Sequence, residues 1–251
     1  MALSCCFSPD ERARQPLLTH HDLETLLHEF GHVLHSVLGR TRFQHLSGTR
    51  SVVDVVEVPS TLMENFAHDP GVLTAMTGHY VTNEPVPAAA LEALAQQRKL
   101  FSALDTLHQV MYGLVDLSLH AHTPTAQEEP GWSYAVAMRA AEAAGSPVMP
   151  AEGCYWYADL SHLASYGANY YSYMWSRAVS ALVWRAHFAR APLAPSAGLP
   201  FVRGFLSCGG SREGHDMVAD VIAEGSAGSE GRSLDEDMRE ASEALLQELT
   251  P

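Results

Sequence analysis

Positive charge is scarce in this sequence of 251 residues, and so are long apolar runs. There are 15 Lys and Arg against 29 Asp and Glu, which gives a formal net charge of −14. Because nucleic-acid-binding proteins usually present a basic face, this charge argues against a nucleic-acid partner. No apolar run reaches the roughly 18 residues that a membrane-spanning helix needs, so we expect no membrane segment.

Cysteine is also scarce, with four residues, two of them adjacent, and no C-x-x-C pair (Cys5, Cys6, Cys154 and Cys208). This usage fits reduced thiols in an intracellular compartment, and it argues against a disulfide framework and a thiolate zinc site. The first residues resemble neither a signal peptide nor a transit peptide. Residues 2–5 are typical of a buried strand entered without a preceding turn, so we expect the chain to be the later part of a longer one.

The remaining composition, 47% apolar and 18% charged, is that of a globular protein. Its periodicity predicts a predominantly helical, all-α fold with one short β-hairpin. We expect a strand remnant and loop over residues 1–21, candidate metal ligands over 22–68, a helical scaffold over 69–160, and a tyrosine-rich segment with C-terminal helices over 161–251. Within these parts, further helices are expected over 88–120, 132–144, 174–190, 213–224 and 234–249, and a loop over 191–200.

The stretch His28-Glu29-Phe30-Gly31-His32 has the pattern H-E-x-x-H within a segment of helical periodicity, about residues 22–38. Residues four apart project from the same face of a helix, so the two imidazoles can bind one zinc ion. Glu29 cannot join them as a ligand without distortion. It can reach a water on the metal, where a hydrolase needs a general base.

The context of this motif supports a metal site. Apolar residues continue almost all round the helix (Leu23, Leu26, Leu27, Phe30, Val33, Leu34, Val37 and Leu38). This pattern predicts a buried helix, in which two histidines and a glutamate are costly unless they are paired or bind metal. Thr19 or Asp22 can cap its start, and Gly39 can end it. His35, one turn beyond His32, either supports a ligand from behind or is a histidine of the core.

Residues 40–50 alternate in polarity and contain Ser47-Gly48, a pattern that predicts a short extended or hairpin segment beside the site. An edge strand at this place can hydrogen-bond a peptide in extended form, which makes Ser47 and Gly48 candidates for substrate binding.

A second helix, expected over residues 52–68, holds the candidates for a third metal ligand. Asp54, Glu57 and Glu64 lie broadly on one face of it. Glu57 is surrounded by valines and Pro59, and a carboxylate in apolar company needs a partner, so we assign it as the ligand of a His₂Glu zinc site. Asp54 and Glu64 are then groups that hold the ligand imidazoles by hydrogen bonds, although Glu64 also fits a solvated helix position.

Tyr166, Tyr170 and Tyr173 have the spacing of one stripe along a helix, close to His162 and to Gly167, which permits a bend. An aromatic stripe is commonly part of a core. Buried phenols nevertheless seek polar partners, and a row of them facing a metal site supplies donors for a tetrahedral oxyanion.

These segments together resemble the thimet oligopeptidase family of zinc metallopeptidases. The resemblance rests on the stretch from Leu17 to His35, on Ser47-Gly48-Thr49, on Asp54-Val-Val-Glu57-Val-Pro59-Ser60 and on Met63-Glu64-Asn65. The stretch from His162 to Tyr173, with its short interval between His162 and Tyr170-Tyr171, is most similar to the mitochondrial intermediate peptidase branch.

The resemblance implies one Zn²⁺ per chain, held by His28, His32 and Glu57, with Glu29 as general base. It also implies that Tyr170 and Tyr173, with His162 and Tyr166, hold the substrate and stabilise the tetrahedral intermediate. The implied fold is nearly all-helical with a zincin-type active-site helix and a deep channel that admits peptides. The mitochondrial matrix is the implied compartment, with the cytoplasm or a plastid as alternatives.

The chain departs from the resemblance in its length, because it matches only the C-terminal catalytic part of family members. We therefore expect the channel wall from the N-terminal portion to be missing and the apolar surface beneath it to be exposed. Two alternatives to a zinc-dependent peptidase remain open. One is a partial chain that binds zinc without the full channel, and the other is a helical interaction protein with a metal-free histidine core.

Overall fold

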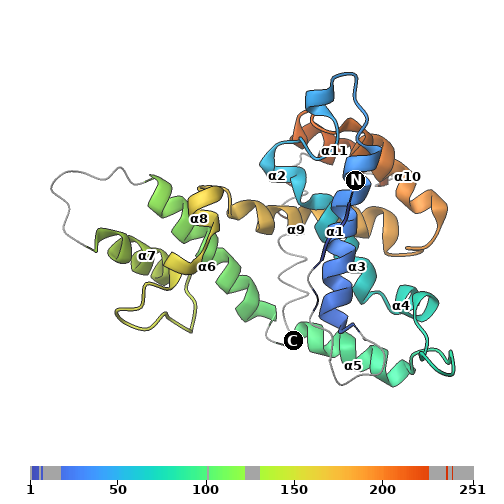
Figure 1. Ribbon diagram of the computed structural model, residues 1–251, viewed down its shortest axis with the longest axis horizontal. Coiled ribbons are helices and arrows are strands. Elements are labelled where there is room, and N and C mark those ends of the chain that lie inside the picture. Colours follow the sequence, from blue (N-terminus) through green and yellow to red (C-terminus); the bar gives the residue numbers. More distant parts are fainter. Residues whose placement is uncertain are drawn as a thin grey trace.

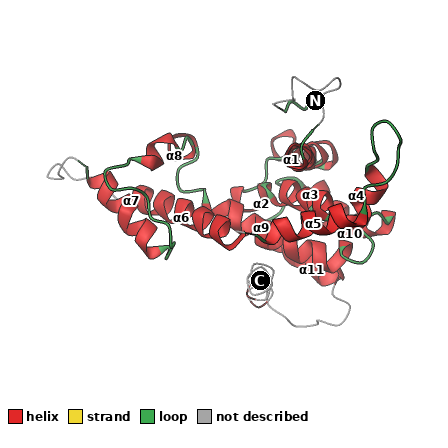
Figure 2. Ribbon diagram, turned by 90° about the horizontal axis from the view of Figure 1, so that it is seen from below, coloured by secondary structure: helices red, strands yellow, loops and turns green. Residues whose placement is uncertain are grey.

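The computed structural model describes residues 2–5, 7, 18–100, 102–121, 131–225, 236 and 239. These residues form helices, turns and loops, and none of them forms a strand (Figure 2). The α-helices are α1 (His20–Leu38), α2 (Val53–Val56), α3 (Val58–His68), α4 (Pro70–Met76), α5 (Ala88–Lys99), α6 (Ser102–Ala121), α7 (Trp132–Ala143), α8 (His162–Ser165), α9 (Tyr171–Val183), α10 (Pro195–Gly204) and α11 (Gly214–Gly225). Short helical turns occupy Gln44–Leu46, Trp156–Asp159 and Leu206–Cys208, and a π-helical turn, Trp184–Phe188, follows α9.

The helices form two groups that α9 joins (Figure 1). One group contains α1 to α5, α10 and α11, and its core includes Val58, Leu62, Val179, Phe205 and Met217. The other contains α6, α7 and α8, with Met111, Val115 and Ala137 among its core residues. Because α9 contacts α2 and α3 at one side and α6 at the other, residues of both groups meet along it.

Helix α1 begins at His20, two residues before the predicted start, with Thr19 of the two predicted caps, and it ends at Leu38 as predicted. The Thr19 hydroxyl accepts a hydrogen bond from the Asp22 amide, and the Asp22 carboxylate accepts one from the Thr19 amide, which together form a capping box. Gly39 ends the helix by donating its N–H to the His35 carbonyl. The prediction of full burial was wrong for the outer face, where Phe30 and Val37 are 41% and 45% exposed.

The predicted hairpin over residues 40–50 is wrong. The segment is a loop with one helical turn, because its polar groups bond within the loop and not across a strand pair. Thr41 and Ser47 hydroxyls are 2.9 Å apart, and the Gly48 amide donates to the Gly39 carbonyl at 2.6 Å. Gly48 has a φ of +73°, which suits glycine and turns the chain back against Ser36 of α1.

The predicted helix over 52–68 is interrupted at Glu57, which lies between α2 and α3. Pro59 explains the break, because it has no N–H to continue the hydrogen bonds of α2, whereas it is tolerated in the first turn of α3. The break places Glu57 at the junction of α2 and α3, so its side chain does not belong to the regular face of either helix.

Other predictions along the chain had mixed outcomes. The predicted loop over 191–200 contains the start of α10, since Pro195 suits a first helical position and Phe201 packs on Phe205 in the core. The helices predicted near 132–144 and 213–224 are confirmed as α7 and α11. Residues 2–5 have no regular structure, so the strand is not found there. Most of the predicted helix over 234–249 lies outside the described residues, and no described helix is long and apolar enough to cross a membrane.

Candidate metal centre

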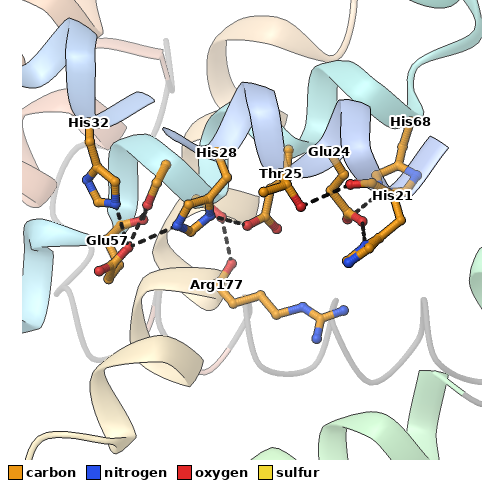
Figure 3. Close-up of polar contacts among 11 residues, drawn as sticks. His21, Glu24, Thr25, His28, His32, Glu57, His68 and Arg177 are labelled. Carbon is orange, nitrogen blue, oxygen red and sulfur yellow. Dashed lines mark hydrogen bonds and ion pairs between the residues drawn. The ribbon is translucent and has the colours of Figure 1, made fainter. Parts of the chain in front are cut away.

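His28, His32 and Glu57 converge on one point between α1 and α3 (Figure 3). The Glu57 Oε2 atom is 3.1 Å from the His32 Nε2 atom and 3.5 Å from the His28 Nε2 atom. One ligand atom from each of the three side chains lies within 4.8 Å of the other two. Among the residues that the structure describes, no other group of His, Cys, Asp and Glu meets the same condition.

This donor set fits zinc. A tetrahedral zinc ion with ligands at about 2.0–2.1 Å would hold neighbouring ligand atoms about 3.3 Å apart. The distances of 3.1 and 3.5 Å lie on either side of that value. Two imidazole nitrogens and a carboxylate oxygen are also one of the ligand sets of catalytic zinc, which leave a position open for water.

The convergence depends on a close approach of two helix backbones. A Cβ added to Gly31 of α1 would lie 2.5 Å from the Pro59 carbonyl oxygen and 2.5 Å from the Ser60 Cα of α3. Only glycine therefore allows α1 and α3 to meet at this point. Since Gly31 lies between the two histidines and Pro59 follows Glu57 by two residues, the contact brings the three side chains together.

Two further side chains orient these candidate ligands. The His28 Nδ1 atom is 2.6 Å from the Glu64 Oε1 atom, so Nδ1 carries the proton and the Nε2 lone pair faces Glu57 and His32. The Ser60 hydroxyl is 2.7 Å from the Glu57 Oε2 atom and 2.8 Å from the Glu57 carbonyl oxygen. The Ser60 side chain is fully buried, which fixes it beside the carboxylate.

The electrostatics of the centre reflect these contacts. Burial lowers the pKa of His28, but the carboxylates of Glu64, Glu57 and Glu29 together raise it above its ordinary value. For Glu57, burial raises the pKa. Hydrogen bonds with His32 and Ser60, and the nearby imidazoles of His32 and His28, lower the pKa by more than burial raises it, so the carboxyl is more acidic than usual. Glu57 is therefore ionised at neutral pH, as a metal ligand must be.

Glu29 and His35 occupy different surroundings. Glu29 is half-buried beside His28 and contributes to the electrostatic effect on that imidazole. His35 is completely buried against Phe205, and neither of its ring nitrogens has a hydrogen-bond partner among the described residues. Burial, and then the neighbouring His32, lower the pKa of His35 to about 4. Of the two predicted roles, His35 thus has that of a core histidine, although its ring nitrogens make no hydrogen bonds to the described residues.

The tyrosines do not form one helical stripe, because α8 ends at Ser165 and α9 begins at Tyr171. Tyr170 and Tyr173 nevertheless lie together, with ring centroids 5.2 Å apart, and both are close to the His162 ring. The His162 Nε2 atom is 3.0 Å from the Tyr173 hydroxyl, and the Tyr170 hydroxyl donates to Gln109 at 3.0 Å. Burial, and then the Glu57 carboxylate, raise the pKa of Tyr173, so a candidate metal ligand acts on this phenol electrostatically.

The remaining predicted residues are less closely connected to the ligands. Tyr166 and Gly167 lie in the loop between α8 and α9, and Tyr166 is 64% exposed. Asp54 accepts a hydrogen bond from the Tyr171 hydroxyl and not from a ligand imidazole. Ser47 bonds within its own loop, and Gly48 lies against Ser36 at the end of α1. The contacts of Asp54 and Gly48 therefore join elements of the fold, whereas those of Ser47 hold its own loop.

Sequence reasoning missed three residues that contact the candidate site. Ser60 holds Glu57, Gln109 holds the Tyr170 hydroxyl, and Asp116 of α6 accepts backbone hydrogen bonds from Ala168 and Tyr170. The only available signal was the three-residue spacing from Glu57 to Ser60. Gln109 and Asp116 lie more than fifty positions before their partners, so no local pattern connects them.

Comparison with known proteins agrees with this geometry. The chain matches the family described as Peptidase family M3 over residues 1–227. It is 40% identical over 208 residues to a mitochondrial intermediate peptidase from Eremothecium gossypii, which covers 83% of this chain and 26% of that protein. It is 38% identical over 211 residues to a mitochondrial intermediate peptidase from Homo sapiens, which covers 84% of this chain and 29% of that protein.

A third relative, a mitochondrial intermediate peptidase from Malassezia globosa, is 40% identical over 219 residues, covering 85% of this chain and 27% of that protein. The chain thus spans less than a third of the length of these relatives. The match to the family extends over His28 and His32 of α1, over Glu57 between α2 and α3, and over Tyr170 and Tyr173 at the start of α9. The chain therefore belongs to peptidase family M3.

Proposed function

We propose that this chain is the catalytic region of a zinc-dependent metalloendopeptidase that hydrolyses peptide bonds in short peptides or N-terminal presequence intermediates. The observation that carries the proposal is the convergence of His28, His32 and Glu57 within 4.8 Å, in a chain of peptidase family M3. The relatives named mitochondrial intermediate peptidase support peptidase activity and a mitochondrial compartment. The presequence substrate and the matrix are what the resemblance to that branch implies.

In this proposal, His28, His32 and Glu57 hold one zinc ion. When bound, zinc would lower the pKa of a coordinated water to about 7 and polarise the carbonyl of the peptide. The carboxylate of Glu29 takes the proton from the attacking water and then passes it to the leaving amine. Glu64 keeps the proton of His28 on Nδ1, so that the Nε2 lone pair remains available for the metal.

The phenols supply the remaining part of the chemistry. Burial raises the pKa of both Tyr170 and Tyr173, so each keeps its proton at neutral pH. The Tyr170 hydroxyl donates to Gln109, so it serves the substrate only when it leaves that acceptor. Tyr173 donates its proton in a hydrogen bond to the oxygen on which negative charge develops when the carbonyl is attacked. This role requires that Nε2 of His162 carries a proton and donates it to the Tyr173 oxygen, which leaves the phenol proton for the substrate.

A fluorescence-quenched peptide tests the function directly. We expect the zinc-loaded chain to cleave it, and Glu29→Gln to retain zinc but lose turnover by several orders of magnitude, because the general base is gone. Glu92→Gln, an exposed residue of α5, is the matched control and should behave as the parent chain. Turnover by Glu29→Gln at the parent rate would contradict the assignment of the base.

The same assay distinguishes the proposal from its closest alternative. A chain that binds zinc but does not cleave the peptide, while a longer chain with the N-terminal portion does, would be a partial site without its channel. His28→Ala provides the metal control, since it should lose zinc in elemental analysis of the purified protein.

A further inference from the structure

The loop between α8 and α9 is held from outside by one buried carboxylate. Asp116 of α6 is completely buried. Its Oδ1 atom accepts a hydrogen bond from the Ala168 amide and its Oδ2 atom accepts one from the Tyr170 amide, each at 2.9 Å. The His120 Nδ1 atom donates to the Asp116 main-chain carbonyl oxygen at 2.9 Å and also lies 2.9 Å from Asp116 Oδ1. Each oxygen of this buried carboxylate therefore has one backbone donor, and the loop supplies both.

This carboxylate binds the backbone immediately before the first turn of α9. Tyr170 is the N-cap residue of α9, and its own side chain makes no capping hydrogen bond. The first amides of a helix need acceptors, and negative charge is favourable at a helix N-terminus. Asp116 accepts the amide of the N-cap residue itself, and it places a carboxylate near the start of α9 from a different helix. It thereby fixes where α9 begins, and so fixes the direction of Tyr170 and Tyr173.

His120, one turn after Asp116 on α6, contacts the same loop. An added Cβ at Gly167 would lie 2.1 Å from the His120 Nε2 atom, and the next two nearest atoms belong to the same ring. The imidazole therefore rests directly against the Gly167 backbone. Ala168, the next residue, has a φ of +61°, which non-glycine residues adopt only when other contacts hold them there. The hydrogen bond from the Ala168 amide to Asp116 is such a contact.

We infer that Asp116 and His120 are positioning residues, which hold the loop from Tyr166 to Tyr170 so that the phenols of Tyr170 and Tyr173 face the peptide carbonyl. The effect on catalysis, through the orientation of Tyr170 and Tyr173, rests on the proposed peptidase function. The structural part, the clamp on the loop, is independent of that function. Asp116 acts through the tyrosines and does not touch the substrate.

Asp116→Asn tests the clamp, because an amide has only one acceptor oxygen for the two loop amides. We expect hydrogen exchange of the Ala168 and Tyr170 amides to become at least about tenfold faster, while exchange in α1 and the zinc content stay unchanged. Asp105→Asn, an exposed acidic residue in the first turn of the same helix, is the control and should leave these amides as they are. Unchanged exchange in Asp116→Asn would overturn the inference.

A second pair of variants avoids the risk that Asp116→Asn does not fold. Gly167→Ala should accelerate exchange at Ala168, because its methyl group collides with His120. His120→Ala removes the ring, so the double variant His120→Ala/Gly167→Ala has room for the methyl group, and we expect its Ala168 exchange to return to that of His120→Ala alone. A double variant that exchanges as fast as, or faster than, Gly167→Ala would show that the ring does not set the loop.

Kinetics distinguish positioning from general stability. We expect Asp116→Asn to lower kcat by about 10²-fold, as a displacement of about 1 Å in a catalytic group can, with a smaller change in KM. Combined with Tyr173→Phe, it should lower kcat by less than the product of the two single effects. Effects that multiply would contradict action through the tyrosines. If the parent chain cleaves no peptide, the proposed function fails, while the exchange experiments still decide the clamp.

Discussion

The two halves of the candidate site are built in different ways. The metal-ligand half is a direct contact between backbones, where Gly31 of α1 meets Pro59 and Ser60 of α3. The tyrosine half contains a loop, and its geometry depends on hydrogen bonds from α6. The ligand half is therefore fixed by steric contact between neighbouring helices. The tyrosine half is fixed by a few polar contacts between residues far apart in the sequence.

The largest expected effect is on the ligand half. Gly31→Ala places a methyl group within 2.5 Å of backbone atoms that cannot rotate away, so α1 and α3 must separate. We expect loss of stoichiometric zinc and destabilisation of about 3 kcal/mol or more, similar to severe overpacking of a core. Elemental analysis and thermal unfolding measure the two effects.

Gly198 of α10 provides the matched control. An added Cβ there meets no atom within 4 Å, so Gly198→Ala should keep its zinc. It should also gain up to about 1 kcal/mol from the higher helix propensity of alanine. If both glycine variants bind zinc equally well, backbone contact at Gly31 does not set the ligand geometry.

The tyrosine half should show a kinetic effect without metal loss. Tyr173→Phe removes a donor from the site, and loss of one such donor typically lowers kcat by about 10²–10³-fold. Zinc content should not change, because the Tyr173 hydroxyl makes its hydrogen bond with His162 and not with a candidate ligand. Tyr80→Phe, an exposed phenol outside the site, is the comparison. Parent-like turnover by Tyr173→Phe would remove the phenol from the mechanism.

A smaller effect is expected behind the ligands. Glu64→Ala removes the carboxylate that is 2.6 Å from His28 Nδ1, and loss of such a partner typically weakens metal affinity by about 10–100-fold. Glu64→Gln keeps an acceptor oxygen, so its loss should be smaller. Competition with a zinc chelator ranks the variants. Equal affinity in all three proteins would show that Glu64 does not orient His28.

The ligand half could largely be predicted from the sequence, because local rules govern it. Four-residue spacing on a helix places His28 and His32 on one face, and Thr19 and Gly39 predict the ends of that helix. The role of Glu57 as the third ligand was inferred from its apolar neighbours. The break that Pro59 causes in the predicted helix was not predicted. The prediction of a hairpin failed because hydroxyl contacts and a glycine with positive φ compete with strand pairing in the segment from Thr41 to Gly48.

The tyrosine half could be predicted only as a set of residues. Spacing alone suggested one helix, whereas the loop from Tyr166 to Tyr170 interrupts it. The reason lies in α6, where Asp116 supplies acceptors that make the interruption stable. Such contacts depend on tertiary structure, and one sequence contains no pattern that pairs Asp116 with residues fifty positions later.

His35 should affect stability and its pH dependence. Its pKa is about 4 in the folded protein against an ordinary value of 6.5. Between pH 6.5 and 4 the unfolded chain therefore binds a proton that the folded chain does not, so stability falls as the pH is lowered. At pH 5 the cost is about 2 kcal/mol relative to pH 7.

Chemical denaturation at pH 7 and pH 5 measures this contribution. His35→Leu should lose about 2 kcal/mol less than the parent chain over this interval. His45→Leu, at an exposed position, should show the same pH dependence as the parent. An identical decline in His35→Leu and the parent would show that the buried imidazole is not the titrating group.

Zinc stoichiometry of the parent chain and of Glu57→Ala tests the central claim most directly, because Glu57 meets the two histidines of α1 from the junction of α2 and α3. After incubation with zinc and gel filtration at neutral pH, we predict one zinc ion per parent chain and a substoichiometric amount in Glu57→Ala. A parent chain that retains no zinc, or a Glu57→Ala variant that retains it with parent affinity, would contradict the account.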